Sequence, residues 1–76
     1  MRFRSLEVVV LRNDIDEHGL KAGDTGTVVE LYEPDGLEVE FLTGTGETRA
    51  VLTLSESDVR HLGPNDMLAV RAVDAA

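Results

Sequence analysis

Hydrophobic and polar residues alternate most cleanly in residues 37–42, the segment LEVEFL. A period of two residues is typical of a β-strand with one buried and one exposed face. The same alternation, with more interruptions, marks residues 5–11, 26–32 and 48–54. The pattern predicts four strands, and a short apolar segment at residues 59–62 predicts a fifth.

Turn signals separate these strands. The segments EPDG at residues 33–36 and TGTGE at residues 43–47 predict two hairpin loops. In Lys21-Ala22-Gly23-Asp24, Gly23 occupies the third position of a turn, where a positive φ suits glycine. We expect the Asp24 carboxylate to accept a hydrogen bond from the backbone N–H of Gly26, and Gly26 itself to mark a bulge or a close backbone approach. The segment SESD at residues 55–58 predicts a single capped 3₁₀ turn.

The resulting order is strand, long loop, strand, hairpin, strand, hairpin, strand, one turn and a short strand. This order is characteristic of an all-β, small five-stranded SH3-like barrel. We assign residues 1–63 to the barrel and residues 64–76 to a C-terminal tail. The tail segment MLAVRAVDAA is rich in helix-forming alanine but also alternates like a strand, so it predicts a short helix or an extra strand.

The alternation also divides the strands into a buried and an outer face. We expect Leu6, Val8, Val10, Leu20, Val29, Leu31, Val39, Phe41, Leu52 and Leu54 to form the core. The outer face then carries the partner-binding candidates Val9, Val28, Glu30, Tyr32, Glu38, Glu40, Arg49 and Val51. Arg49 is expected to pair with the glutamates across the strands.

The 76 residues suffice for one domain, and without cysteine the chain has neither disulfides nor thiolate metal sites. Its net charge of −8 argues against nucleic-acid binding, because seven Lys and Arg residues are scattered among fifteen acids. The acidic balance favours solubility or attraction to a basic protein partner. The N-terminal apolar run is too short for a signal peptide or a membrane span, so we expect a cytoplasmic protein that does not bind membranes.

Candidate chemistry is sparse. Asp14, Asp16 and His18 alternate oxygen and nitrogen ligands in the long loop, but the calcium-loop pattern is absent and a transition-metal site wants more His or Cys. They are weak metal candidates, and we expect neither a metal nor another cofactor. No serine has a histidine at a recognisable motif spacing, so the sequence does not predict an enzyme.

The tail residues Met67, Leu68, Val70 and Val73 supply apolar side chains with little charge. We expect residues 67–73 to cover the outward apolar residues Val9, Val28, Tyr32 and Val51. The tail would do so in its own chain or in a homodimer formed through the tail.

Three segments carry a family resemblance: LEVVVLRNDIDEHGLKAGDTGTVVELYE, LEVEF and TRAVLTLSESDVRHL. Together they resemble the bacterial domain-of-unknown-function family numbered 4926 over residues 6–62. The family is uncharacterised, so the resemblance implies an SH3-like barrel and no activity.

Three hypotheses for function remain open. The first is a non-catalytic protein-interaction module, in a more specific form an antitoxin-like, immunity-like or accessory protein that binds a basic partner. The second is a metal-dependent enzyme or metal carrier that uses the loop of Asp14, Asp16 and His18. The third is a nucleic-acid-binding small barrel.

Overall fold

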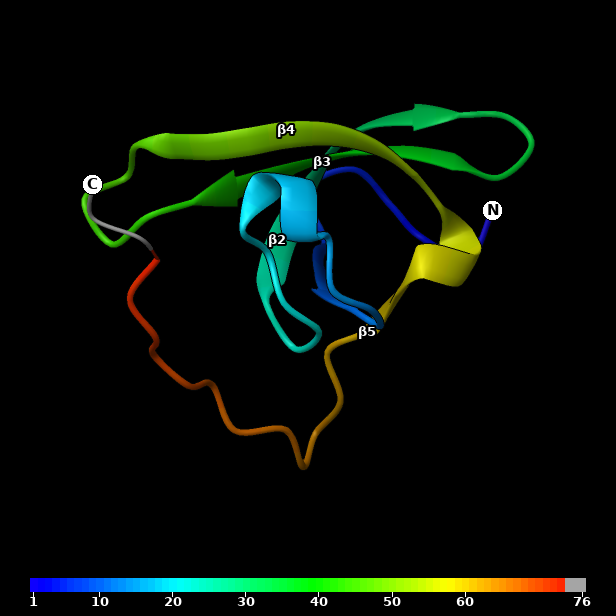
Figure 1. Ribbon diagram of the computed structural model, residues 1–76. Coiled ribbons are helices and arrows are strands. Elements are labelled where there is room, and N and C mark those ends of the chain that lie inside the picture. The colour runs from blue at the N-terminus through cyan, green and yellow to red at the C-terminus, as the bar shows by residue number, and fades with distance from the viewer. Residues whose placement is uncertain (74–76) are drawn as a thin grey trace.

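The computed structural model describes residues 1–73 and confirms an all-β fold with five strands in one antiparallel sheet (Figure 1). The strands are β1 (Val8–Leu11), β2 (Thr25–Tyr32), β3 (Gly36–Leu42), β4 (Thr48–Ser55) and β5 (Val59–His61). Two 3₁₀ turns accompany them: η1 (Asp16–His18) in the long loop and η2 (Glu56–Asp58) between β4 and β5. The predicted strands are all present, although β1 begins at Val8 rather than at residue 5.

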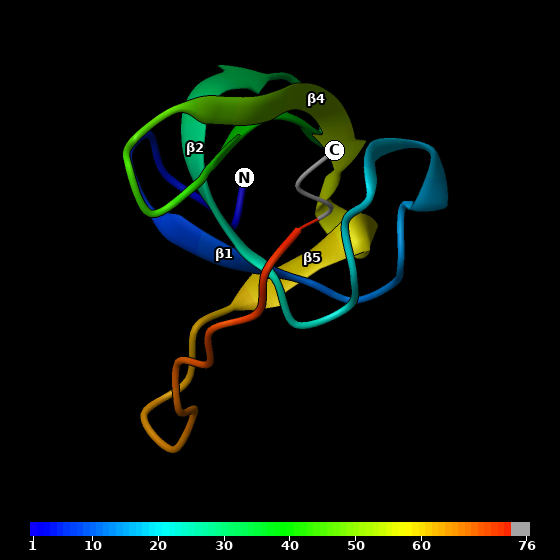
Figure 2. The same ribbon diagram turned by 60° about the vertical axis from the view of Figure 1, so that its left-hand side comes forward.

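The strands lie in the order β4-β3-β2-β1-β5, so the last strand pairs with the first. Figure 2 shows how the sheet curls until β1, β2, β4 and β5 surround a common interior. The η2 turn connects β4 to β5, and its capping matches the sequence prediction. The Ser55 hydroxyl accepts from the backbone N–H of Ser57, and the Asp58 carboxylate accepts from that of Ser55 at 2.8 Å. The element order and this turn confirm the SH3-like arrangement.

The turn before β2 is closed as predicted, with one correction. Gly23 has a φ of +94°, and the N–H of Asp24 donates to the carbonyl of Lys21 at 2.9 Å. The Asp24 carboxylate accepts from the N–H of Lys21 at 2.8 Å, so the expected bond to the N–H of Gly26 is wrong. Gly26 instead lies within β2, in register with Val9 of β1.

Gly26 is required because of a close approach inside the barrel. A Cβ atom there would lie 2.6 Å from Cγ1 of Val39 and 2.9 Å from Cε1 of Phe41. Both distances are shorter than a carbon–carbon contact tolerates. The predicted role of Gly26 as a point of close backbone approach is confirmed.

The core fills the interior of the curled sheet. The prediction is confirmed for Val10, Leu20, Val39 and Phe41, which are buried, and for Leu31, Leu52 and Leu54, which are partly buried against the core cluster. The prediction is wrong for Leu6, Val8 and Val29, which are 75%, 40% and 38% exposed. The residues that form the buried cluster are Phe3, Val9, Leu11, Leu20, Val28, Leu37, Val39, Phe41 and Val59.

A β-bulge explains the error in β2. Val28 is in register with Val39 and Glu30 with Glu38, so Val29 is an extra residue without a partner on β3. Because a single extra residue reverses which side chains face inward, Val28 is buried before the bulge and Leu31 points toward the core after it. Strict alternation along the strand placed Val28 on the wrong face.

The error in β1 has a different cause. Val9, Val10 and Leu11 are all buried, so this short strand is covered on both faces and a period of two carries little information about orientation. Val9 and Leu11 belong to the core cluster, whereas Val10 lines a groove beneath the tail. Leu6 lies before the strand with a left-handed φ of +71°, outside the alternation altogether.

The tail is neither a helix nor a strand over residues 64–73, which corrects the sequence prediction. It leaves β5, makes a turn and runs back past the barrel (orange to red in Figure 1). Its Met67, Leu68 and Val70 are 92%, 72% and 101% exposed. The tail does not cover the predicted residues, because Val9 and Val28 belong to the core while Tyr32 and Val51 remain exposed. A tail-mediated homodimer stays a prediction.

Candidate functional site

The outer side of β2 and β3 brings three glutamates together. Glu30 lies directly opposite Glu38, and Glu40 lies two residues further along β3 on the same side of the sheet. We call Glu30, Glu38 and Glu40 the acidic face. The prediction that these glutamates share adjoining strands is confirmed.

Two threonines of β4 support the acidic face. The Thr53 hydroxyl donates to Oε1 of Glu38 at 2.6 Å, and the Thr48 hydroxyl donates to Oε2 of Glu40 at 2.7 Å. Neutral donors orient the carboxylates without cancelling their charge. Sequence reasoning missed both threonines, because a register shift between β3 and β4 is needed to bring Thr53 opposite Glu38.

Arg49 is not positioned as predicted. β3 and β4 change register between Phe41 and Leu42, where Ala50 and Thr48 are the successive partners, so Arg49 is an extra residue on β4. Its Nε donates to the carbonyl of His18 in the long loop at 3.3 Å, and its side chain lines the groove beneath the tail. The bulge turns Arg49 toward this loop, and Thr48 takes the place beside Glu40.

The apolar partner-binding candidates divide into two pairs. Val9 and Val28 are 1% and 0% exposed and belong to the core, so their assignment to an outer surface is wrong. Val51 is exposed in register with Glu40, and Tyr32 is exposed opposite Gly36 at the end of β2. The acidic face is therefore bordered by one apolar residue on β4 and one at the end of β2.

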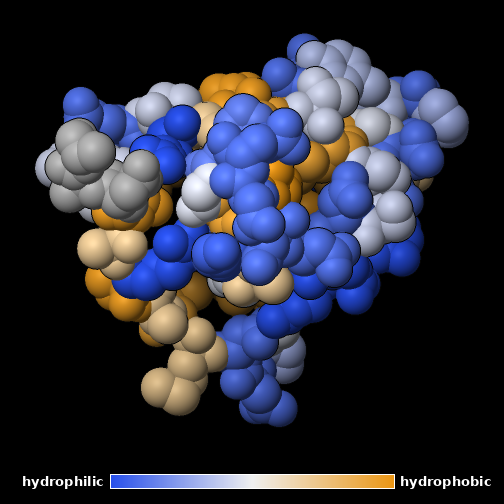
Figure 3. Space-filling model, viewed as in Figure 1, coloured by the Kyte–Doolittle hydropathy of each residue, from blue (hydrophilic) through white to orange (hydrophobic). Residues whose placement is uncertain are grey.

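β4 forms one margin of the sheet. In the described part of the chain it pairs with β3 alone, and residues 50–54 make no backbone hydrogen bond other than those to β3. Its inward side chains Ala50, Leu52 and Leu54 are only half-buried, whereas Leu37, Val39 and Phe41 of β3 are buried. Figure 3 shows hydrophobic surface at the top of the molecule, where β4 runs in Figure 1. The core is thus incompletely covered along β4.

The loop of Asp14, Asp16 and His18 is arranged around a lysine. The Asp14 carboxylate accepts from the N–H of Ala22 at 2.8 Å, and the Lys21 ammonium lies 3.9 Å from Asp14 and 3.5 Å from Asp16. Within residues 1–73 no group of three or more His, Cys, Asp or Glu side chains is placed to hold a metal ion. The loop carboxylates of Asp14 and Asp16 therefore form solvent-exposed ion pairs with Lys21.

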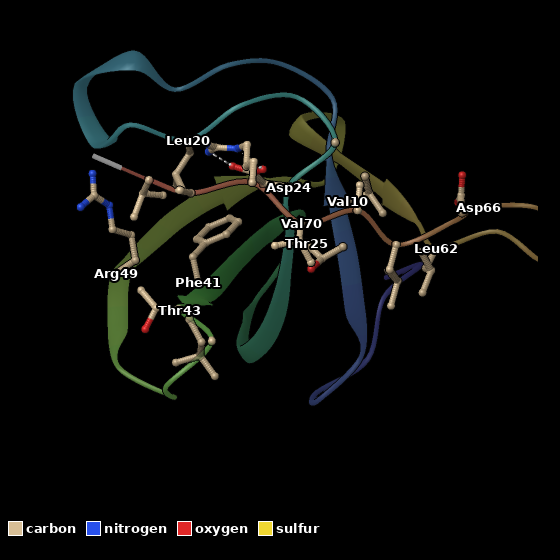
Figure 4. A pocket seen from close by; sticks show the side chains of 18 of the residues that line it. Val10, Leu20, Asp24, Thr25, Phe41, Thr43, Arg49, Leu62, Asp66 and Val70 are labelled. Atoms are coloured by element: carbon tan, nitrogen blue, oxygen red, sulfur yellow. Dashed lines mark hydrogen bonds and ion pairs between the residues drawn. The ribbon is translucent and has the colours of Figure 1, made fainter. Parts of the chain in front are cut away.

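A groove of about 790 Å³ lies between the tail and one end of the barrel (Figure 4). Leu20 and Phe41 face this groove from the barrel side, and Val10 and Thr25 lie beside them. The tail crosses the groove at Val70. Arg49 lies toward one end of the groove and Asp66 toward the other. The tail therefore covers an apolar opening of the barrel with Met67, Leu68 and Val70 exposed and Val73 half-buried against the groove.

Within residues 1–73, the ion pairs of Arg60 with Asp66 and of Arg71 with Asp24 hold the tail over the groove. Arg60 donates to both carboxylate oxygens of Asp66, at 2.8 and 3.2 Å, and Arg71 donates to both oxygens of Asp24 and to the carbonyl of Gly19. The Arg60 guanidinium and the N–H of Gly63 lower the pKa of Asp66. The Arg71 guanidinium lowers the pKa of Asp24, against the opposing effect of partial burial.

The fold and the site define a small SH3-like barrel with an acidic outer face and a C-terminal tail that ion pairs hold against the barrel. The chain belongs to the family described as Domain of unknown function (DUF4926), whose model matches residues 5–61. This confirms the family expected from the sequence. The comparisons with curated proteins and with solved structures find no match. The described residues contain no helix with the length and hydrophobicity of a membrane-spanning segment.

Proposed function

We propose that this protein is a non-catalytic interaction module of the cytoplasm that binds a basic protein partner through its acidic face. The observation that carries the proposal is the pairing of Glu30 with Glu38 directly across two strands. Like charges in this position destabilise a sheet. The positive groups of a partner would relieve this repulsion on binding.

The surroundings of the acidic face support the same proposal. Glu38 and Glu40 accept hydrogen bonds from threonine hydroxyls, while Lys21, Arg60 and Arg71 pair with carboxylates elsewhere in the chain. The negative charge of the acidic face is therefore available to attract a cation-rich surface, which increases association rates. Neither nucleic-acid binding nor a metal-dependent activity has a comparable observation in its favour.

A module of this kind suits a protein that masks a basic surface of its partner, as an antitoxin-like or immunity-like protein would. It also suits an accessory subunit that positions a basic partner. Both forms depend on the same acidic face, so one experiment tests them together.

The experiment is affinity purification of the tagged chain from its own cells, compared between two variants of equal charge. One variant carries Glu30→Gln, Glu38→Gln and Glu40→Gln, and the control carries Glu17→Gln, Glu33→Gln and Glu47→Gln, at exposed glutamates away from the acidic face. Both variants lose three of the fifteen acidic residues. We expect a basic protein to co-purify with the wild type and the control and to be lost from the first variant. Equal retention by the two variants would refute the proposal.

A further inference from the structure

The open margin of β4 is the surface from which a further inference follows. Natural sheets protect such a margin with charges, proline, bulges or very short strands. β4 carries one bulge and one charge, both at Arg49, and the remaining segment AVLTLS at residues 50–55 contains neither charge nor proline. By contrast, the opposite margin, β5, is only three residues long.

We propose that the basic partner binds by adding an extended segment alongside β4, as a further strand of the sheet. This inference rests on the proposed function, because it assumes that the acidic face attracts the partner. It adds two points. Main-chain hydrogen bonds to residues 50–54 hold the partner, and the partner's segment carries a defined sequence pattern.

The two faces of β4 specify that pattern. On the core side, an added strand would cover the half-buried Ala50, Leu52 and Leu54, which calls for apolar side chains. On the outer side, its side chains would lie beyond Val51 and Thr53, which are in register with Glu40 and Glu38. Strands lie about 4.8 Å apart, so an added strand would be roughly 10 Å from β3. A Lys or Arg side chain and a Glu side chain together span this distance.

The partner's segment should thus alternate basic and apolar residues over about five residues, a length of roughly 17 Å that matches residues 50–54. Charge favours this occupant over a second copy of the chain. Pairing two β4 strands about a two-fold axis would bring two acidic faces together on one continuous sheet, in a protein whose net charge is −8.

The test uses three synthetic hexapeptides of alternating lysine and valine, with blocked ends. One has normal peptide bonds, one is N-methylated at its odd residues and one at its even residues. Because a strand directs its N–H groups alternately to two sides, only one of the two N-methylated peptides loses the donors that face β4. The binding of each peptide to the full-length chain is measured by calorimetry. Amide hydrogen exchange of residues 50–54 is followed by NMR.

We expect the unmodified peptide and one N-methylated peptide to bind similarly, and the other to bind at least about tenfold more weakly through the loss of two or three hydrogen bonds. Alternate amides of residues 50–54 should exchange more slowly in the complex. If all three peptides bind equally and the Glu30→Gln, Glu38→Gln, Glu40→Gln variant binds none, strand addition is wrong while the acidic face still binds basic partners. If no peptide binds, both proposals lose their support.

The chain alone supplies a second control. If it sediments as a dimer whose residues 50–54 are already protected from exchange, the margin of β4 is occupied by a second copy and the inference is overturned. A monomer with fast exchange at alternate residues of this segment is the expected result.

Discussion

Arg71 and Asp24 are 47 residues apart in the chain and form a bidentate ion pair that holds the tail against the barrel. The Nε of Arg71 donates to Oδ1 of Asp24 at 2.9 Å, and Nη2 donates both to Oδ2 of Asp24 and to the carbonyl of Gly19. Asp24 also closes the turn before β2 by accepting from the N–H of Lys21. One carboxylate therefore connects the tail to the turn on which β2 depends.

The attachment of the tail should depend on pH. The Arg71 guanidinium lowers the pKa of Asp24 below its ordinary value of 3.8 in the folded protein. The stabilisation by ionised Asp24 is therefore fully present above the ordinary pKa of an unfolded aspartate, and it is lost as the pH falls through the lower pKa of the folded protein. Below about pH 4 we expect the NMR signals of residues 67–73 to shift toward those of a detached tail while the barrel amides stay protected from exchange. Asp24→Asn should remove this pH dependence, and an unchanged acid transition in that variant would exclude Asp24 as its cause.

Gly26→Ala should destabilise the protein. The new methyl group would lie 2.6 Å from Val39, 2.9 Å from Phe41 and 3.1 Å from the carbonyl of Glu40, and overpacking of this kind costs about 1–3 kcal/mol. Gly44→Ala is the matched control, because a methyl group at Gly44 meets no atom within 4 Å. Denaturation by urea measures both changes, and equal stability of the two variants would contradict the packing described for Gly26.

Phe41→Ala should lower the free energy of unfolding by about 3–5 kcal/mol, because the ring is buried among Val39, Leu20 and the other core residues. A domain of this size has little stability to spare, so the variant is expected to be largely unfolded at 37 °C. Leu42→Ala, at the exposed neighbouring position, should change stability by no more than about 0.5 kcal/mol. Circular dichroism during thermal melting distinguishes these outcomes.

Glu38→Gln should stabilise the isolated protein slightly, by about 0.2–1 kcal/mol, because it removes the repulsion from Glu30 across the strands. The side-chain oxygen of glutamine still accepts from Thr53, so the hydrogen bond is retained. The gain should shrink as salt is added, since salt screens exposed charges. Glu47→Gln in the second hairpin loop is the control, and a Glu38→Gln variant less stable than this control would show that Glu30 does not repel Glu38.

The acidic face was largely predictable because the evidence for it is local. Residues 37–42 alternate so regularly that Glu38 and Glu40 had to share a face, and the EPDG turn brings β2 alongside β3. The positive φ of Gly23 and the capped turn at Ser55 were predictable for the same reason, since each depends on a few neighbouring residues. The weak metal candidates in the long loop were visible in the sequence, but the lysine placed between them was not.

Only the tertiary structure decided which side of β1 and β2 faces the core. A bulge at Val29 reverses the inward side of β2, and the local alternation of apolar residues does not reveal where the extra residue falls. The second bulge moves Arg49 away from the acidic face. The Phe3 ring stacks on His61, and this contact brings the first residues of the chain against β5. The path of the tail likewise depends on a long-range ion pair, Arg71 with Asp24, in addition to the local pair of Arg60 with Asp66. Alternation records the preference of each residue for a buried or an exposed side, whereas register and long-range pairing depend on how the whole sheet closes around its core.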